Sequence, residues 1–141
     1  MHLRKLWIVA IYILLIGIGV GASVYFSVKG NVKVFESNVT VYPQYFSIDV
    51  AKGMEYVKKL RVNNSGAKVC VYFEDVISGP NPEMVDVKFR DTNGNSIYFG
   101  RPICLPEGTA EAPSTTVVYA HIIVNESAPT GNYSIYIFVR D

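Results

Sequence analysis

Two cysteines, Cys70 and Cys104, carry the clearest chemistry in this sequence of 141 residues. Both follow a long apolar N-terminal run, and an even cysteine count in an exported domain predicts a disulfide rather than two free thiols. A bridge between them encloses 33 residues, which by chain entropy would stabilise the fold by about 3–4 kcal/mol. Cys70 is out of phase with the apolar residues Val71 and Phe73, so we expect the bridge on the outer side of a sheet or at a loop.

Four Asn-x-Ser/Thr sequons also follow the apolar run, at Asn38, Asn63, Asn125 and Asn132. Such sequons accept N-linked glycans at the surface of exported proteins. The alternative is that Asn, Ser and Thr serve there only as turn residues. In a host that performs N-glycosylation, the four sites predict a glycoprotein.

Residues suited to catalysis are sparse. Histidine occurs at His2, before the apolar run, and at His121, where the alternation of the surrounding strand predicts an exposed side chain. A Ser-His-Asp or Cys-His arrangement needs its histidine held in a pocket. No group of His, Cys, Asp and Glu has the spacing of a metal site. We therefore expect a protein that is not an enzyme, has no cofactor and takes no small-molecule substrate.

The stretch DTNGNS, residues 91–96, has two interpretations. Asp91, Asn93 and Asn95 occupy positions 1, 3 and 5 of a calcium loop, but position 6 is Ser96 and no Glu stands at position 12. Asn-Gly between two alternating runs is a strong hairpin signal with a primed turn. The sequence favours the hairpin.

The N-terminal run from Leu6 to Val28 contains 23 residues without a charge. A helix of that length covers about 34 Å, enough to cross a bilayer. Basic residues before the run favour a cytoplasmic N-terminus. We predict a cytoplasmic tail at residues 1–5, a transmembrane helix at residues 6–28 and an extracytoplasmic remainder.

Two other interpretations and one helix-packing motif concern the same apolar run. The run also fits a signal peptide that is cut after Ala22, because a basic start, an apolar stretch and a small residue precede that bond. Gly17 and Gly21 form a GxxxG pair, which would let two membrane helices pack closely, although glycine is common in such helices anyway. A phosphate-binding glycine loop is excluded, because the glycines follow no strand-and-turn unit.

Beyond residue 30 the hydrophobic period changes from helical to two. Short runs rich in Val, Ile, Tyr and Phe alternate with turn residues, as in β proteins. About seven to nine such runs predict an all-β, immunoglobulin-like antiparallel β-sandwich over residues 37–141, with residues 29–36 as a tether or first strand. The balance of 13 basic against 12 acidic residues argues against a nucleic-acid partner.

The alternation in the last two predicted strands separates inward from outward residues. Tyr119, Tyr136 and Phe138 point outward, and they would form one aromatic patch if the two strands are neighbours. Such a patch would dock a partner or the membrane, whereas scattered surface aromatics are the alternative. The residues predicted to face the core are Val118, Ala120, Ile122, Val124, Tyr133, Ile135, Ile137 and Val139.

Two segments resemble a known group of domains. KKLRVNNSGAKVCVYFE (58–74) resembles the strand, N-x-G turn and strand of CARDB-type and α-galactosidase-associated immunoglobulin-like domains. AHIIVNESAPTGNYSIYIFV (120–139) resembles their closing element, in which an A-P-x-G-x-Y turn leads into the last strand. The resemblance implies an immunoglobulin-like fold and no catalytic residues. Such domains serve as spacers, adhesion modules or accessory subunits.

A second resemblance is to the TasA/camelysin group of secreted fibre subunits. GASVYFSVKGNVKV (21–34) resembles the end of the signal peptide and the N-terminal strand of that group, and FSIDVAKGMEYVKKLRVNNSG (46–66) resembles its opening hairpin. The resemblance implies that a freed N-terminal strand completes the sheet of the next subunit. Val24, Phe26 and Val28 alternate as such a donor strand requires.

The sequence therefore leaves two functions to test. The first is a non-enzymatic, single-pass membrane protein whose extracytoplasmic domain binds or braces a protein partner in the cell envelope, such as an S-layer, a filament base or a membrane complex. The second is a secreted fibre subunit that associates with itself by donor-strand addition after signal cleavage.

Overall fold

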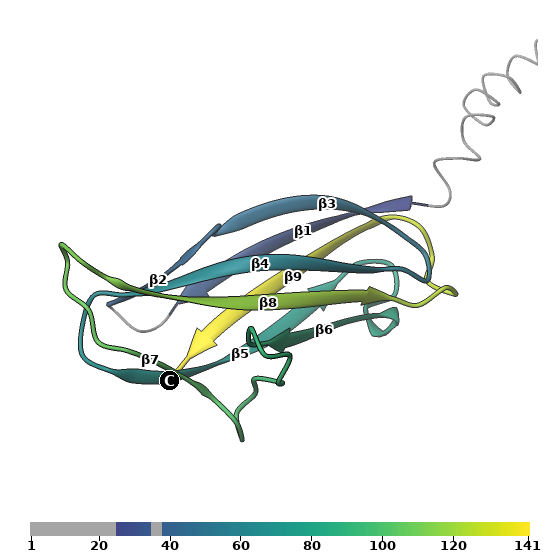
Figure 1. The fold of residues 1–141 in the computed structure, drawn as a ribbon. Helices are drawn as coiled ribbons and strands as arrows, with labels where there is room; N and C mark the ends of the chain where they lie inside the picture. Colours follow the sequence, from purple (N-terminus) through teal and green to yellow (C-terminus); the bar gives the residue numbers. More distant parts are fainter. Residues whose placement is uncertain (1–24, 35–37) are drawn as a thin grey trace, which may run out of the picture.

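The computed structural model describes residues 25–34 and 38–141, which form an all-β fold (Figure 1). Within these residues it contains nine strands and one short 3₁₀ turn, η1 (Pro82–Met84). This confirms the all-β class that the period-two alternation predicted. The strands are β1 (Tyr25–Val34), β2 (Val39–Tyr42), β3 (Tyr45–Ala51), β4 (Glu55–Asn64), β5 (Val69–Ser78), β6 (Val85–Arg90), β7 (Ile103–Leu105), β8 (Ser114–Val124) and β9 (Asn132–Arg140).

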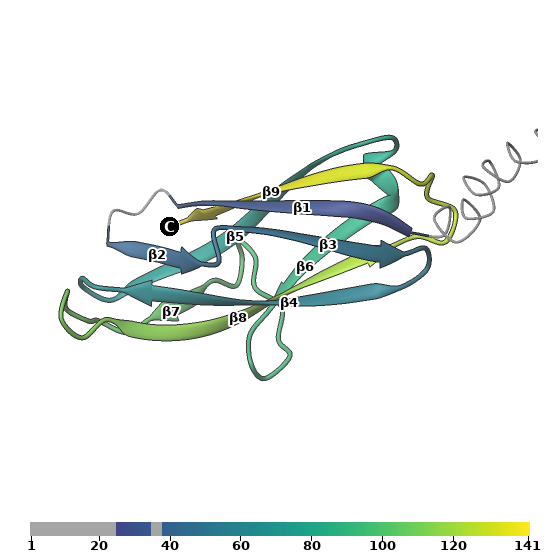
Figure 2. The same cartoon turned by 90° about the horizontal axis from the view of Figure 1, so that it is seen from above.

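The strands form two sheets that pack against each other as layers (Figure 2). One sheet has five strands in the order β3-β1-β9-β5-β7, and the other has four in the order β2-β4-β8-β6. Val, Ile, Leu and Phe side chains from alternate positions fill the space between the layers. The inward rows predicted for β8 and β9 are confirmed, since all eight of their residues are buried.

β1 lies between β3 and β9, and its pairing with β9 is parallel. The prediction of an antiparallel sandwich is wrong for this pair. β1 and β9 come from opposite ends of the domain, so no short turn between them forces an antiparallel arrangement. Val28 and Val32 of β1 are buried in the core.

The start of β1 also corrects a predicted boundary. β1 begins at Tyr25, so residues 25–28 belong to the sheet and not to a membrane helix. The reason is that this segment pairs with β3 and places Val28 in the core. The rest of the predicted helix, with Gly17, Gly21 and the bond after Ala22, lies outside the described residues. In the part of the chain that the structure describes, no helix has the length and apolar character needed to cross a membrane.

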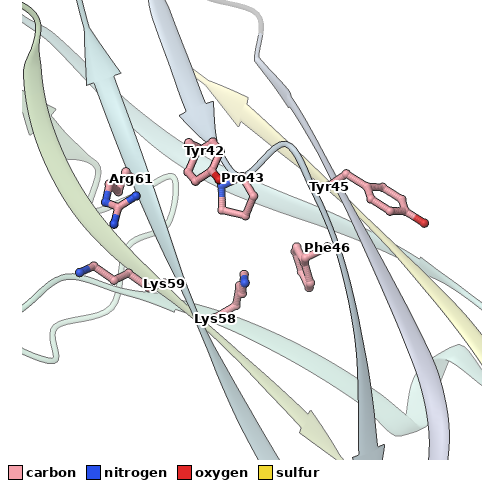
Figure 3. Close-up of a pocket in the computed structure, with 7 residues that line it drawn as sticks. All are labelled: Tyr42, Pro43, Tyr45, Phe46, Lys58, Lys59 and Arg61. Atoms are coloured by element: carbon pink, nitrogen blue, oxygen red, sulfur yellow. The ribbon is translucent and has the colours of Figure 1, made fainter.

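β2 and β3 follow each other in the chain but belong to different sheets. The chain crosses over at Pro43, after a cis Tyr42–Pro43 peptide bond (Figure 3). Because of this early crossing, β2 pairs with β4 only along residues 61–64. Among the described residues, the segment 55–60 of β4 therefore has β8 on one side and no strand on the other.

Candidate functional site

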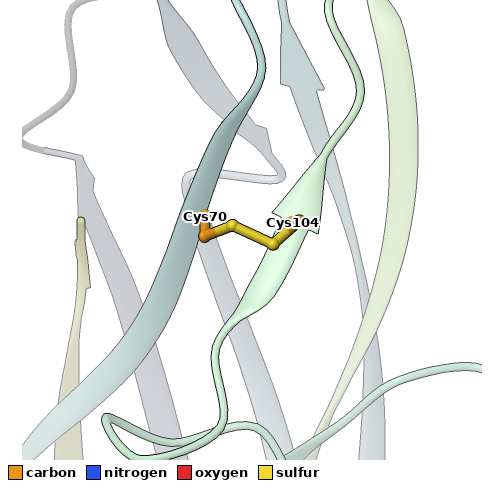
Figure 4. Close-up of a disulfide and its surroundings, with 2 residues drawn as sticks. All are labelled: Cys70 and Cys104. Carbon is orange, nitrogen blue, oxygen red and sulfur yellow. A yellow bond between two sulfur atoms is a disulfide. The ribbon is translucent and has the colours of Figure 1, made fainter.

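Cys70 and Cys104 form a disulfide between β5 and β7 (Figure 4). The two residues lie directly opposite each other in the strand register. Val71 and Leu105 beside them are buried, so the bridge lies on the outer side of the sheet, as predicted. It fastens the three-residue edge strand β7 to the rest of the sheet, which gives it a structural role.

Exposed aromatic and apolar side chains gather on the outer side of the five-stranded sheet and on the loop that follows β6. Phe99 is 77% exposed, and its ring meets that of Tyr72 edge-to-face at 5.3 Å between centroids. Tyr136 lies opposite Val76 in the strand register. A pocket of about 600 Å³ opens among several of these side chains. We call this surface the aromatic face, and it consists of Tyr72, Val76, Tyr98, Phe99, Tyr136 and Phe138.

Tyr119 does not join the aromatic face. β8 and β9 are consecutive strands, but they belong to different sheets, so the condition for a single patch is not met. Tyr119 lies on the outer side of the four-stranded sheet, between Lys59 and Arg90 in the register. Tyr136 and Phe138 point outward from the other sheet, as predicted.

Charged groups border the aromatic face. Arg140 donates a hydrogen bond to Glu74, and its guanidinium carbon lies 5.7 Å from the centroid of the Phe138 ring. Asp75 belongs to the inner row of β5 and reaches the lining of the same pocket. Burial raises the pKa of its carboxyl group, and the nearby Asp86 carboxylate raises it further. An apolar centre with a charged rim is the usual arrangement of a protein interface.

Three of the four sequon asparagines are exposed: Asn38, Asn125 and Asn132. Asn63 is half-buried in β4, where its side-chain oxygen accepts a hydrogen bond from the hydroxyl of Thr115 at 2.8 Å. Asn125 also accepts a bond from the backbone N–H of Ser127 at 2.8 Å. Glycosylation stays a prediction, and the exposed sites are the better candidates.

A turn closed by Asp91 forms at Asn93-Gly94, but the predicted primed turn is wrong, because Gly94 has a positive φ and Asn93 does not. The residues after the turn pair back with β6 at an isolated bridge, Arg90–Ser96. The side-chain Oδ1 of Asp91 accepts hydrogen bonds from the backbone N–H groups of Asn95 and Asn93, both at 2.9 Å. These bonds, with that of Asn95 the strongest influence, lower the pKa of the Asp91 carboxyl group. The carboxylate of Asp91 thus stabilises the turn. The described residues contain no group of three or more His, Cys, Asp and Glu able to hold a metal ion.

His121 lies on the outer side of β8, where its Nδ1 contacts the carboxylate of Glu55. The residues opposite it on the neighbouring strands are Val57 and Lys88. Neither completes a Ser-His-Asp or Cys-His arrangement. The geometry around His121 is that of a surface contact between an imidazole and a carboxylate.

The sequence reasoning missed a pocket of about 450 Å³ where the chain crosses from β2 to β3 (Figure 3). The Nζ atom of Lys58 lies 5.6 Å from the centroid of the Phe46 ring, and the guanidinium carbon of Arg61 lies 5.9 Å from that of Tyr42. Two consecutive lysines in an alternating strand are a usable signal, because one of them must face the inner side. We call this site the basic pocket, lined by Tyr42, Pro43, Tyr45, Phe46, Lys58, Lys59 and Arg61.

Comparison with known proteins yields one informative relative. A protein of Archaeoglobus fulgidus, described as an uncharacterized protein, is 47% identical over 139 residues, which make up 98% of this chain and 99% of the relative. The chain belongs to the family of this Archaeoglobus protein. The similarity extends over nearly the full length of both chains. No protein-family model matches the chain.

Proposed function

We propose that this protein is a non-enzymatic, membrane-anchored protein of the cell envelope that holds a protein partner with its aromatic face. The observation that carries the proposal is the exposure of Phe99, Tyr136 and Val76 on one side of the domain. Contiguous exposed apolar surface with a charged rim is characteristic of protein interaction sites. Aromatic side chains also supply a large part of the binding energy at such sites.

Two features support placement outside the cytoplasm. The part of the apolar run that β1 does not use, Leu6 to Val24, would cover about 28 Å as a helix, close to the thickness of a bilayer core. The Cys70–Cys104 disulfide fits an oxidising compartment. We therefore propose a single-pass protein with a cytoplasmic N-terminus and an extracytoplasmic β domain, with Asn38, Asn125 and Asn132 accessible to glycosylation.

One contact supports the more specific proposal that the β domain is immunoglobulin-like. The side chain of Tyr133, at the start of β9, is buried, and its hydroxyl donates a hydrogen bond to the carbonyl of Pro129 at 2.9 Å. A tyrosine near the start of a strand that bonds back to the preceding turn is a known feature of immunoglobulin-type sandwiches. Here it fastens the A-P-x-G-x-Y turn, the segment in which the sequence resembles such domains.

The variant Phe99→Ser tests the aromatic face, with Met54→Ser as its matched control. Both side chains are more than half exposed and lie outside the strands. The full chain is purified from host membranes in mild detergent, and the protein that accompanies the wild type is identified and quantified by mass spectrometry. We expect Phe99→Ser to retain about tenfold less of that partner and Met54→Ser to retain it fully. Equal retention by the two variants contradicts the proposal.

A fibre subunit that polymerises by donor-strand addition is the second candidate, favoured by the position of β1. This N-terminal strand fills the gap between β3 and β9 and contributes Val28 and Val32 to the core. A neighbouring subunit's β1 would fill the same gap with the same contacts. N-terminal sequencing of the mature protein separates the two functions. A start near Ser23 contradicts the anchor, whereas a start at Met1 or His2 contradicts the fibre.

A further inference from the structure

The basic pocket lies beside an unfilled strand position of the four-stranded sheet. β2 runs along β4 until Tyr42, opposite Arg61, and then leaves for the other sheet. Past that point the described residues provide no neighbour for residues 55–60 of β4 on the side away from β8. Such an edge presents main-chain N–H and C=O groups that can pair with another extended chain.

Three cations surround this unfilled position. Lys58 belongs to the inner row of β4, in line with the buried Leu60, and reaches across to the Phe46 ring of the other sheet. Lys59 and Arg61 project from the outer side of the same strand. In the part of the chain that the structure describes, the contacts between a basic side chain and a carboxylate are Lys88–Asp86, His121–Glu55 and Arg140–Glu74. The three pocket cations therefore have no carboxylate partner there, which favours an anionic occupant.

We propose that an extended, acidic segment of a partner protein adds to β4 in the position that β2 leaves at Tyr42. Its main chain pairs with residues 55–60, which as a strand span about 20 Å. Because successive side chains of a strand point to opposite faces, one carboxylate of the segment meets Lys58 on the inner side, and the next residue toward Tyr42 meets Lys59 on the outer side. Arg61, which pairs with Tyr42, adds positive charge just beyond the end of the segment. The exposed ring of Tyr42 closes the end of the position where β2 turns away.

The charge of Lys58 decides which strand can add. An inward lysine on an edge strand discourages pairing with neutral strands, because pairing would bury the ammonium group without a counter-ion. A carboxylate placed against Lys58 removes that cost and forms a charge-assisted hydrogen bond. The lysine thus rejects indiscriminate strand pairing and selects an acidic segment. An acidic glycan would also meet the cations, but it has no strand backbone to pair with the edge of β4.

This site is separate from the aromatic face. The basic pocket lies at the β2–β4 edge of one sheet, and the aromatic face lies along β5 and β9 of the other. A substitution at Lys58 therefore leaves the aromatic face unchanged, and Phe99→Ser leaves the basic pocket unchanged. Failure of one proposal does not imply failure of the other.

The test measures binding of fluorescent peptides to the full chain by fluorescence anisotropy. The probe has about eight residues of Glu, Val and Thr, enough to cover the open edge. One counterpart has Gln for every Glu, and a second keeps the Glu but is N-methylated at alternate residues, which blocks main-chain pairing. We expect the probe to bind and both counterparts to bind at least about tenfold more weakly.

Two variants make the test specific to the pocket. Lys58→Gln is expected to weaken binding of the probe about tenfold, and Lys88→Gln, a cation of the same sheet on β6, to leave it unchanged. If Lys58→Gln fails to fold, as judged by its thermal midpoint, Lys59→Gln replaces it with the same expectation.

Three results would overturn the proposal. One is equal binding of the N-methylated peptide, because charge alone would then account for the affinity. Another is binding of polygalacturonate, an acidic sugar polymer, in a Lys58-dependent manner without binding of the probe. The third is absence of probe binding at about millimolar concentration. Self-association of Lys58→Gln would then show that Lys58 serves only to guard the edge.

Discussion

The ring of Phe46 fills the space that a side chain at Gly30 would need. The two residues pair in register between β1 and β3, and a Cβ atom added at Gly30 would lie 2.1 Å from Cζ of the Phe46 ring. The same ring lies 5.6 Å from the Nζ atom of Lys58. Phe46 thus joins the N-terminal strand, the edge strand β3 and the basic pocket.

Gly30→Ala should therefore destabilise the domain by about 1–3 kcal/mol, because the Phe46 ring or the backbone of β1 must move. The loss of unfolded-state entropy that Ala brings offsets only about 0.4–1 kcal/mol of this effect. Denaturant unfolding followed by fluorescence measures the change. Asn31→Ala, the next residue of the same strand and exposed, is the matched control, expected to change stability by at most about 0.5 kcal/mol. Equal effects of the two substitutions would show that the close contact between position 30 and the Phe46 ring does not determine the loss of stability.

Replacing both Cys70 and Cys104 by Ser should lower the free energy of unfolding by about 3–4 kcal/mol. The bridge joins residues 34 positions apart, and a loop of that length loses this much unfolded-state entropy on closure. Denaturant unfolding of the oxidised wild type, the reduced wild type and the double variant measures it. The reduced wild type should behave like the double variant. A loss in the variant without a loss on reduction would mean that the serines, not the missing bridge, cause the damage.

Asp75→Asn should raise the thermal midpoint at pH 7. Burial and the nearby Asp86 raise the pKa of Asp75 in the folded protein above its ordinary value of 3.8, so above the folded pKa the ionised carboxylate destabilises the fold. As the pH falls through the folded pKa, the wild type takes up this proton and gains stability. The advantage of Asp75→Asn should accordingly shrink toward pH 3.8.

Calorimetry across this pH range measures both chains. Asp49→Asn, on the exposed edge strand β3, is the control and should change the midpoint little at any pH. A constant gain from Asp75→Asn across the whole range would exclude proton binding as its cause.

Asp91→Ala should loosen the turn between β6 and residue 96 without unfolding the sandwich. The carboxylate of Asp91 holds the N–H groups of Asn93 and Asn95, and its pKa is lowered by these bonds. The stabilisation of the turn by the ionised Asp91 carboxylate is therefore present above pH 3.8. It is lost as the pH falls through the lower pKa that Asp91 has in the folded protein. Amide hydrogen exchange at these two positions measures it, with Thr92→Ala as the control. Unchanged protection in Asp91→Ala would contradict the assignment.

Local alternation was enough to predict which residues of a strand face the core. Val118 to Val124 and Tyr133 to Val139 alternate strictly, and period two alone decides the face. The outer position of the disulfide followed from the same logic, because Cys70 is out of phase with Val71.

Alternation within a strand could not predict which strands pair with one another. Tyr119 and Phe138 lie close in the sequence but on different sheets, because the turn between β8 and β9 changes layers. β9, the parallel partner of β1, lies at the other end of the domain. No turn joins the two strands directly, so turn residues could not predict this pairing. The basic pocket combines β2, β3 and β4, and it exists because the chain crosses between sheets at Pro43. The local sign of the basic pocket in the sequence is Lys58, a charged residue on the inner row of β4.

Site-specific photo-crosslinking in the native membrane tests the role of the aromatic face most directly. A photoreactive phenylalanine analogue is placed at Phe99 or, as the control, at Met54, and the products are identified by mass spectrometry. We predict one discrete product from position 99, containing a protein other than this chain, and no such product from position 54. No product from position 99, the same products from both positions, or a product made only of copies of this chain would contradict a partner-binding aromatic face.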